Sequence, residues 1–323
     1  MKPYPFQFNN TSSSKDEPTR DTAPSHLCRG RIPSVQASQL RAMIREAYSD
    51  PSKILATCCS DDGLGSRLVE EAGFPYIFLG GFMVASSFGL PDTGYIAFQE
   101  MVSRIQEVKR QTTVPIIADG DTGYGFPVNV RRTVQGFAMA GAAGIMIEDQ
   151  TWPKRCGHTQ GKSVVSREEA FTRIQAAVDA RNEGVDIVIN ARTDSFILGW
   201  DEAIFRAKKF VEIGADMVFL EALPDRETMK KTIEALDFPV MANIIEGGLT
   251  DNLSAEELGK IGFSIVVYPF TMVAARVKAV REALESLKVS FTTGAPPRIM
   301  SAGEVCEAVG FNKYWELEEK YKY

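Results

Sequence analysis

Short apolar runs alternate with longer amphipathic stretches from residue 38 onward. The runs show no alternation of apolar and polar positions, which is typical of parallel strands buried on both faces. They occupy residues 54–59, 76–81, 115–120, 144–149, 186–192, 217–222, 239–244 and 264–269. This pattern predicts eight strands of a buried, parallel sheet.

The stretches between these strands have the pattern of helices. Residues 65–73, 167–184 and 201–216 are examples, and many stretches end in glycine just before the next strand, as helix C-caps do. Eight strand–helix units in about 230 residues favour a closed barrel over an open, doubly wound sheet. An open sheet would carry a G-x-G-x-x-G fingerprint after its first strand, and residues 58–67 (CCSDDGLGSR) contain none. The predicted fold is an α/β, (β/α)₈ TIM-type barrel.

The same pattern divides the chain into three segments. Residues 1–35 are rich in Ser, Thr, Pro, Asn and charge, and we expect a flexible N-terminal arm. The barrel is expected to occupy 36–290. A C-terminal helical extension is expected over 291–323, with residues 301–320 beyond a Gly-Ala-Pro-Pro break at 294–297.

Composition and charge narrow the class of partner. The 323 residues are 44% hydrophobic and 24% charged, which is ordinary for a globular protein. A net charge of -6 argues against a nucleic-acid partner and against a membrane surface. No apolar run approaches the roughly 18–20 residues of a membrane span. We therefore expect a soluble protein that acts on a small molecule.

The cysteines and the N-terminal charges bear on the compartment. An odd number of thiols without regular spacing or a signal peptide favours a reducing environment and free Cys28, Cys58, Cys59, Cys156 and Cys306. Asp16, Glu17 and Asp21 are unusual for a transit peptide, so we expect a cytoplasmic rather than a mitochondrial location.

Carboxylates gather where the third and fourth strands end. Asp119 and Asp121 belong to D-G-D-T-G-Y-G, and Glu148 and Asp149 close I-E-D. Barrel active sites lie at the C-terminal strand ends, and adjacent strands are about 4.8 Å apart, so these carboxylates should converge. D-x-D alone matches turn chemistry. Two such motifs at neighbouring ends predict a Mg²⁺ site that Mn²⁺ can also fill.

A candidate acid–base group follows the fourth strand in a long loop. The motif K-R-C-G-H (154–158) places Cys156 among basic side chains, which are expected to lower the pKa of the thiol and ease proton transfer. Gly157 and Gly161 would let the loop close as a lid. The alternative is an ordinary small residue beside a solvated basic pair.

Two further strand ends carry groups that suit carboxylates. Arg192, in N-A-R-T-D at the fifth strand, would hold a substrate carboxylate with two hydrogen bonds. Its alternative is a structural ion pair with Glu148 or Glu221. Asn243 offers an amide for a second carboxylate. The pair Cys58-Cys59 (58–59) is expected to pack in the core.

These motifs, in this order, resemble the isocitrate lyase/phosphoenolpyruvate mutase superfamily over nearly the whole chain from about residue 38. K-R-C-G-H is similar to the lyase branch, which includes 2-methylisocitrate, 2,3-dimethylmalate and plant 2-alkylmalate lyases and fungal oxaloacetate hydrolases. Cys156 argues against carbon–phosphorus chemistry, because the phosphorus-handling members lack the loop cysteine. The resemblance implies a homotetramer, a dimer of dimers, in which a C-terminal helix is exchanged between subunits; residues 301–320 are the expected counterpart.

The resemblance also implies roles for single residues. The Mg²⁺ ligands, direct or through water, would be Asp121, Asp119 and Glu148, and Asp92 of GLPDTGY would orient the waters. The residues expected in catalysis are Cys156, Arg192, Glu221 and His158. Those expected to contact substrate are Gly80, Gly81, Phe82, Lys154, Gly157, Asn243 and Thr250.

The chain departs from the family pattern at two places. Leu79 stands where a hydroxyl residue is frequent, and Ile77 stands where some lyases have tyrosine, so the base that deprotonates the substrate hydroxyl is left open. After the seventh strand, Gly-x-Thr/Ser-Pro becomes Gly-Leu-Thr-Asp (248–251). A serine at this point accompanies oxaloacetate hydrolases, so Thr250 favours another substrate.

The function that these features predict is cleavage of a carbon–carbon bond. A 2-hydroxy dicarboxylate of the 2-alkylmalate or methylisocitrate type would give a 2-oxoacid and a carboxylic acid, with Mg²⁺ as cofactor. Hydrolysis of oxaloacetate to oxalate and acetate is the nearest alternative. A non-catalytic barrel is disfavoured because the metal carboxylates and Cys156 are all present. A Schiff-base aldolase would need a lysine at a strand end.

Overall fold

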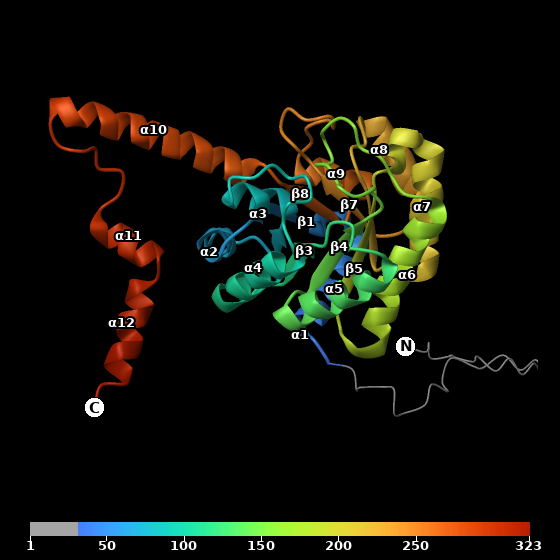
Figure 1. Ribbon diagram of the computed structural model, residues 1–323, viewed down its shortest axis with the longest axis horizontal. Coiled ribbons are helices and arrows are strands. Elements are labelled where there is room, and N and C mark those ends of the chain that lie inside the picture. The colour runs from blue at the N-terminus through green and yellow to red at the C-terminus, as the bar shows by residue number, and fades with distance from the viewer. Residues whose placement is uncertain (1–31) are drawn as a thin grey trace, which may run out of the picture.

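The eight apolar runs form eight parallel strands in the computed structural model, which describes residues 32–323. Each strand pairs with the next, and β8 pairs with β1, so the sheet closes into a barrel (Figure 1). The strands are β1 (Leu55–Ser60), β2 (Ile77–Leu79), β3 (Ile116–Asp119), β4 (Gly144–Glu148), β5 (Val188–Thr193), β6 (Met217–Leu220), β7 (Val240–Asn243) and β8 (Ile265–Tyr268). All eight overlap the predicted runs, and the predicted TIM-type barrel is confirmed.

Helices cover the outside of this barrel, as expected from the amphipathic stretches. Left-handed glycines end three of them, Gly141, Gly214 and Gly262, with φ of 108°, 111° and 117°. The helices are α1 (Val35–Ser49), η1 (Pro51–Lys53), α2 (Gly63–Glu71), α3 (Gly81–Ser87), α4 (Phe98–Gln111), α5 (Pro127–Ala140), α6 (Arg167–Gly184), η2 (Ser195–Leu198), α7 (Trp200–Ile213), α8 (Arg226–Leu236), α9 (Ala255–Ile261), α10 (Thr271–Thr293), α11 (Ala302–Ala308) and α12 (Phe311–Lys320).

Two apolar layers hold the barrel together and leave one end of it for the site. The larger layer lies between strands and helices, and the smaller fills the barrel interior with side chains such as Phe78, Met146 and Phe219. Leu40 and Ile44 of α1 belong to the inner layer, so α1 closes the N-terminal end of the barrel. The C-terminal strand ends are the remaining place for chemistry.

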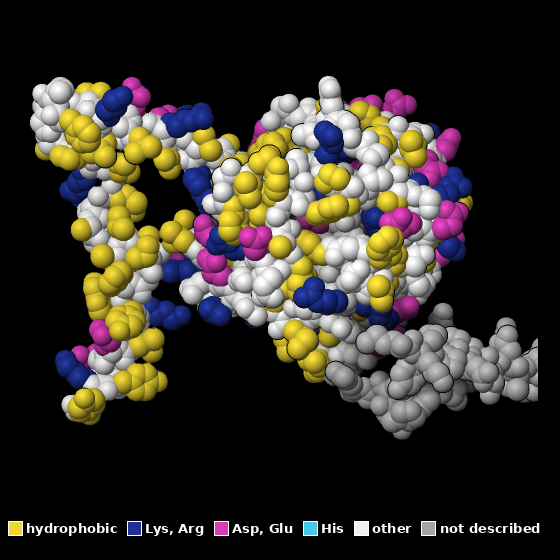
Figure 2. All heavy atoms as spheres, in the orientation of Figure 1, with side chains coloured by type: hydrophobic (Ala, Val, Ile, Leu, Met, Phe, Trp, Pro, Cys, Tyr) yellow, Lys and Arg dark blue, Asp and Glu magenta, His cyan; other side chains and the backbone are white. Residues whose placement is uncertain are grey.

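The C-terminal helices extend away from the barrel (Figure 1). Helix α10 runs unbroken through the expected boundary at 290/291, because it continues directly from β8 and ends only at Gly294. Near its start, Arg276 pairs with Asp61 at 2.7 and 2.9 Å. Figure 2 shows many hydrophobic side chains along the arm that α10, α11 and α12 form. Among those exposed are Leu284, Phe291, Phe311, Trp315 and Leu317.

The remaining expectations concern the N-terminal arm, the membrane and the thiols. Most of the expected arm, and Cys28 with it, lies outside the described residues, which begin with a bridge from Ile32 to Val185. Within residues 32–323, no helix is both long and apolar enough to cross a membrane. The cysteines of this part of the chain, Cys58, Cys59, Cys156 and Cys306, are free, as expected.

Candidate active site

A small cavity of about 50 Å³ lies at the C-terminal end of the barrel. It brings together most of the residues that the sequence predicts for the site. Those that line it are Gly80, Gly81, Phe82, Asp92, Asp119, Cys156, Gly157, His158, Arg192, Glu221 and Asn243. A cavity of roughly 150 Å³ holds a benzene molecule, so a dicarboxylate needs more room than this cavity offers. Substrate binding would therefore require the covering loop or the lining side chains to move.

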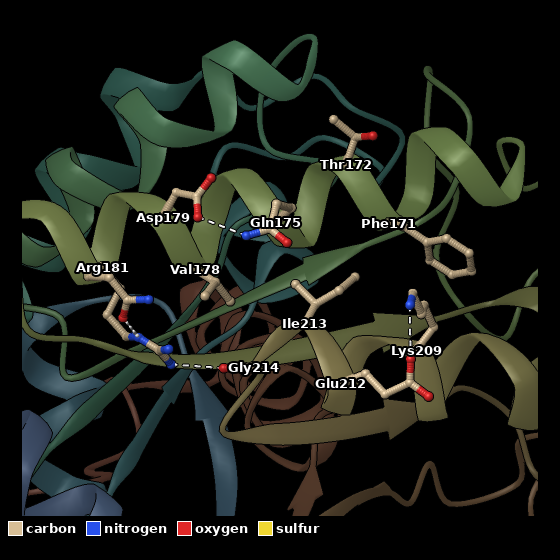
Figure 3. Close-up of a pocket in the computed structure, with 11 residues that line it drawn as sticks. Phe171, Thr172, Gln175, Val178, Asp179, Arg181, Lys209, Glu212, Ile213 and Gly214 are labelled. Atoms are coloured by element: carbon tan, nitrogen blue, oxygen red, sulfur yellow. Dashed lines mark hydrogen bonds and ion pairs between the residues drawn. The ribbon is translucent and has the colours of Figure 1, made fainter. Parts of the chain in front are cut away.

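A larger hollow of about 860 Å³ lies elsewhere, between α6 and α7 on the outer surface (Figure 3). Its polar side chains bond within their own surroundings. Gln175 donates to Asp179 at 2.8 Å, and Lys209 pairs with Glu212 at 2.9 Å. The hollow is lined by residues of α6 and α7 and by none of the strand ends, so the smaller cavity is the candidate active site.

The D-G-D-T-G-Y-G segment positions the first carboxylates by a strained turn. Asp121 has a φ of 48°, in the left-handed region, and its N–H donates to Asp119 Oδ1 at 3.0 Å. Asp119 Oδ2 accepts from the N–H of Gly81 at 3.1 Å. The N–H of Gly81, which was expected to contact substrate, is thus occupied by Asp119 in this structure.

Lys154 extends from the loop into this carboxylate cluster. Its side chain is only 3% exposed, and Nζ lies 2.5 Å from Asp92 Oδ1 and 2.8 Å from Asp121 Oδ1. Buried carboxylates are costly unless a cation lies beside them, which explains the position. Lys154 lines the metal side of the site rather than the cavity, where it was expected to contact substrate.

The cluster remains short of positive charge with Lys154 in place. Burial raises the pKa of Asp121 to about 7 and the pKa of Glu148 well above its usual value, against the opposing effect of neighbouring cations. Glu148 Oε1 is buried without a hydrogen-bond partner, and Asp121 Oδ1 meets only the ammonium of Lys154. The Glu148 oxygen is available to a further cation.

These residues fit Mg²⁺ better than a metal enclosed by protein. Within residues 32–323, no three Asp, Glu, His or Cys side chains converge as a ready-made ligand set. Mg²⁺ commonly keeps several waters and takes only one or two carboxylates from the protein. The unpartnered Glu148 oxygen, with Asp121, Asp92 and Asp119 nearby, matches that preference.

Arg192 is held by three carboxylates at the end of β5. It makes two hydrogen bonds to Asp194, at 2.8 and 3.1 Å, and lies 3.2 Å from Glu148 and 2.9 Å from Glu221. Burial alone would raise the pKa of Glu221, but Arg192 and then His158 outweigh it and hold this pKa at about 2. The ion pairs that were the alternative interpretation are present, and Arg192 lines the cavity as well.

The loop that carries Cys156 covers the cavity as a short hairpin. At its base, Thr151 N donates to Ser163 O and Val165 N to Asp149 O, each at 2.9 Å. Gly157 approaches so closely that a Cβ there would overlap the side chains of Glu221 and Arg192. The loop therefore lies directly over the arginine, and its movement as a lid stays a prediction.

The expected low pKa of the Cys156 thiol is wrong for this structure. Burial raises the pKa above its ordinary value of 9.0, and Asp92 and Glu221 add to the effect. The sequence suggested the opposite because three basic residues flank the thiol. Lys154 is instead neutralised by Asp92 and Asp121. A raised pKa keeps the thiol protonated at neutral pH, which suits a proton donor.

His158 joins the loop to two strand ends. Its Nδ1 accepts from the N–H of Leu249 at 3.2 Å, so in the neutral ring the proton lies on Nε2, 3.1 Å from Glu221 Oε1. Thr250, expected to contact substrate, lines a separate hollow with Asn243 and does not line the cavity. Its effect on the substrate, if direct, would require the 246–251 loop to move.

Apolar residues form the side of the cavity that the sequence motifs did not indicate. The rings of Phe82 and Phe270 lie 4.4 Å apart, and Pro269 and Ile245 extend the same wall. Cys59 packs in the inner apolar layer, as expected, and also lines the cavity. The period of two along β1 turns Cys58 outward and Cys59 inward, a signal that the sequence already held.

Asp194 and Lys162 are further residues that the motifs left unassigned. Asp194 is fully buried, binds Arg192, and lies 2.8 Å from Lys162 of the loop. N-A-R-T-D was noted for its arginine alone. A carboxylate two residues after Arg192 would extend from the same side of an extended chain, which was the available signal.

The C-terminal end of this parallel eight-stranded barrel carries carboxylates, a guanidinium and a loop thiol. This arrangement is typical of an enzyme that acts on small carboxylic acids. The sequence profile of the phosphoenolpyruvate phosphomutase family matches residues 50–288. The chain belongs to the phosphoenolpyruvate mutase/isocitrate lyase superfamily, a superfamily of enzymes, as its motifs predicted.

Lyases and hydrolases of this superfamily are similar to the chain. It is 37% identical to 2,3-dimethylmalate lyase of Eubacterium barkeri, covering 87% of this chain and 97% of the relative. It is 36% identical to 2-methylisocitrate lyase of Escherichia coli (strain K12), covering 84% and 90%. These relatives support a carbon–carbon lyase without fixing the substrate.

Solved structures give the same range of activities. An oxaloacetate acetylhydrolase bound to 3,3-difluorooxalacetate matches with a TM-score of 0.81 at 32% identity, covering 88% of this chain and 96% of its own. A phosphonopyruvate hydrolase bound to oxalate and Mg²⁺ matches with a TM-score of 0.76 at 25% identity, covering 88% and 99%. A member of the superfamily thus binds Mg²⁺ and a dicarboxylate together.

Proposed function

We propose that this protein is a Mg²⁺-dependent lyase that cleaves a 2-hydroxy dicarboxylate to a 2-oxoacid and a carboxylic acid. The observation that carries the proposal is Cys156, a protonated thiol on a covering loop. It lines the same cavity as Asp92 and Asp119 of the carboxylate cluster and as Arg192. A proton donor opposite a metal-type cluster is what such a cleavage requires.

Asp121, Asp119 and Glu148 would hold the Mg²⁺, with Asp92 ordering its waters. When bound, Mg²⁺ supplies Lewis-acid polarisation of the substrate's 2-oxygen and adjacent carboxylate. Lys154 would keep the cluster's remaining charge balanced. Its ammonium already lies between Asp92 and Asp121.

The chain's own residues then account for the bond changes. The substrate hydroxyl loses its proton to a carboxylate lining the cavity, the C2–C3 bond breaks, and C2 becomes the carbonyl of a 2-oxoacid. The electron pair of the broken bond passes into the other fragment as an enediolate, beside which Arg192 stabilises charge. Cys156 donates its thiol proton to C3, giving the carboxylic acid. Ile77 and Leu79, apolar and buried in β2, take no part in proton transfer.

The cavity suits a substrate with alkyl groups. One wall of the cavity is apolar and consists of Phe82, Phe270, Pro269 and Ile245. A further charged group of the substrate would find no polar partner on this wall. Arg192 is already shared among three carboxylates, so a third substrate carboxylate would find little compensating charge. Of the two substrate types, these features favour 2-alkylmalates, including 2,3-dimethylmalate, over methylisocitrate.

Hydrolysis of oxaloacetate is the second candidate. The structural match to an oxaloacetate acetylhydrolase, with a TM-score of 0.81, favours it. The apolar wall opposes it, because oxaloacetate has no alkyl group to bury there. Thr250, which spoke against oxaloacetate in the sequence, does not line the cavity and so carries less weight.

We also propose a homotetramer, a dimer of dimers in which the C-terminal helices are exchanged between subunits. The support is the exposed apolar surface of α10, α11 and α12, including Phe311 and Trp315, which a lone subunit would leave in water. A cytoplasmic location is proposed as well, and the free thiols of the described residues support it.

A substrate panel tests the proposed activity. Malate, 2-methylmalate, 2,3-dimethylmalate, methylisocitrate and oxaloacetate are each incubated with enzyme and Mg²⁺, and 2-oxoacid release is followed with a coupled dehydrogenase. We expect pyruvate from the methylmalates, loss of activity with chelator, and its return with Mg²⁺. Oxalate production from oxaloacetate, without 2-oxoacid from any malate, would establish the hydrolase instead.

A further inference from the structure

The loop over the cavity is held down by three cationic or potentially cationic side chains. Lys154 lies between Asp92 and Asp121, and His158 lies beside Glu221. Both of these act on residues already assigned to the site. The third, Lys162, lies at the far end of the loop and has no part in the chemistry described so far.

Lys162 forms an ion pair with Asp194, whose carboxylate also binds Arg192. Its side chain is 6% exposed, although the residue belongs to a polar surface loop, and Nζ lies 2.8 Å from Asp194 Oδ1. The same oxygen accepts from Arg192 at 3.1 Å, and Asp194 Oδ2 accepts from Arg192 at 2.8 Å. Asp194 therefore joins the loop to the arginine of the cavity through one buried carboxylate.

This arrangement needs the loop to be in place. When the loop lifts, Lys162 leaves Asp194, and Arg192 alone must neutralise a fully buried carboxylate. When the loop closes, Lys162 helps to neutralise Asp194. The positive charge of Arg192 is then more available to a ligand in the cavity. Gly157 closes over Arg192 in the same movement, because the two are already in contact.

We propose that Lys162 is a positioning residue that latches the loop through Asp194 and makes the orientation of Arg192 depend on loop closure. The proposal rests on the proposed function only for its kinetic readout. Lys162 touches no reacting atom; it acts by placing Cys156 and Arg192 together over bound substrate.

Lys162→Met tests the latch, because methionine keeps the length of the side chain and removes the ammonium. We expect kcat for 2-oxoacid release to fall roughly ten- to a hundredfold, since small misplacements of catalytic groups cost about that much, while KM changes by less than about threefold. Lys162→Arg, which restores a cation, should recover most of the rate. Gln160→Met, an exposed residue of the same loop, is the matched control and should behave as wild type.

Limited proteolysis supplies a readout that needs no turnover. Oxalate with Mg²⁺ serves as the probe, and thermolysin cleavage within residues 150–166 is followed by mass spectrometry. The probe should protect this loop in wild type, Gln160→Met and Lys162→Arg, but not in Lys162→Met. Thermal unfolding of each variant confirms that it is folded.

The outcomes separate the latch from the activity. Equal protection in Lys162→Met and wild type would overturn the latch, whatever the substrate. A lyase rate in Lys162→Met equal to wild type would overturn it also. If wild type releases no 2-oxoacid from any malate, the proposed function fails, and the proteolysis comparison still decides the latch.

Discussion

At the scale of single residues, the site consists of a loop rich in basic residues that packs on a barrel end rich in carboxylates. The loop residues Lys154, His158 and Lys162 contact carboxylates of the barrel end. Burial of these carboxylates without neighbouring basic groups would be costly in free energy. Cys156 remains between them as a neutral thiol facing the cavity. The proposed roles of metal ligand and acid therefore fall to groups whose environments differ.

Replacing Cys156 by serine should abolish most turnover and spare binding. A serine hydroxyl is a far weaker acid than a thiol, and general acid catalysis is worth about 10²–10⁴-fold, so we expect kcat for the preferred malate to fall by that order. Calorimetric titration with oxalate and Mg²⁺ should give an affinity close to wild type. Turnover within a factor of a few of wild type would show that another group donates the proton.

The raised pKa of Cys156 predicts slow alkylation. Thiolate is the reactive form, so burial that raises the pKa above 9.0 should make Cys156 react more slowly with iodoacetamide at pH 8 than a cysteine in an unfolded peptide does. The thiol of Cys156 stays protonated at pH 8. For this reason kcat should decline only as the pH rises beyond the raised pKa of this thiol. Peptide mass spectrometry measures the alkylation. Faster labelling than the free thiol would contradict a neutral donor.

At the scale of elements, neighbouring helices are tied by ion pairs that carry no chemistry. Glu202 of α7 binds Arg206 on its own helix at 2.7 Å and also Arg167 at the start of α6. The hydrogen bonds from Arg167 and the one from Arg206 hold the pKa of Glu202 at about 2, below its ordinary 4.5. This carboxylate helps to fix α6, and α6 follows directly from the covering loop.

Glu202→Gln should lower stability at neutral pH and matter less in acid. The depressed pKa makes the contribution full above about pH 4.5, and it disappears as the pH falls toward 2. Because Arg167 is partly exposed, we expect about 1 kcal/mol near pH 7. Urea unfolding at pH 7 and pH 3 measures the difference. Glu256→Gln, which removes an exposed pair with Lys260, is the control; an equal loss at both pH values would contradict the assignment.

The elements were predictable because they depend on local pattern. Each strand is an uninterrupted apolar run, and glycines such as Gly141 and Gly214 mark helix ends in the sequence as they do in the structure. The end of α10 was also encoded locally, because the helix stops at Gly294, the first residue of the Gly-Ala-Pro-Pro break. The expected boundary at 290/291 lies a few residues before this break.

The site was predictable where residues stand on strand ends and less so where they stand on loops. Asp119 and Arg192 meet at the cavity because parallel strands end at one edge. The positions of Lys154 and Thr250 depend on how a loop folds over distant residues, and no periodicity encodes that. The prediction of a low pKa for the Cys156 thiol was wrong for the same reason, because burial and not the sequence neighbours determines this pKa.

At the scale of the whole molecule, the barrel is self-contained and the C-terminal arm is not. The barrel buries its apolar side chains in two layers, whereas α10 to α12 leave theirs exposed (Figure 2). Exposed apolar surface of this extent marks an interface. The proposed exchange of helices would bury it in a second copy of the chain.

Trp315→Asp should dissociate the assembly. A charge placed on the apolar side of α12 would be buried at the interface at a cost that exposed positions do not incur. Light scattering after gel filtration should report a tetramer for wild type and a smaller species for the variant. Asn312→Asp adds the same charge to the same helix without removing an apolar side chain, and it should remain tetrameric. A wild-type monomer would contradict the proposed assembly.

Cleavage in heavy water tests the central claim most directly. If Cys156 protonates the departing fragment, the propanoate formed from 2,3-dimethylmalate in D₂O should carry one deuterium at the former C3, in a single configuration, because the thiol exchanges with solvent and faces one side of the cavity. Nuclear magnetic resonance of the isolated acid, as an ester of a chiral alcohol, measures both properties. Equal amounts of the two configurations would mean that the fragment is protonated in solution, and this would contradict Cys156 as the proton donor.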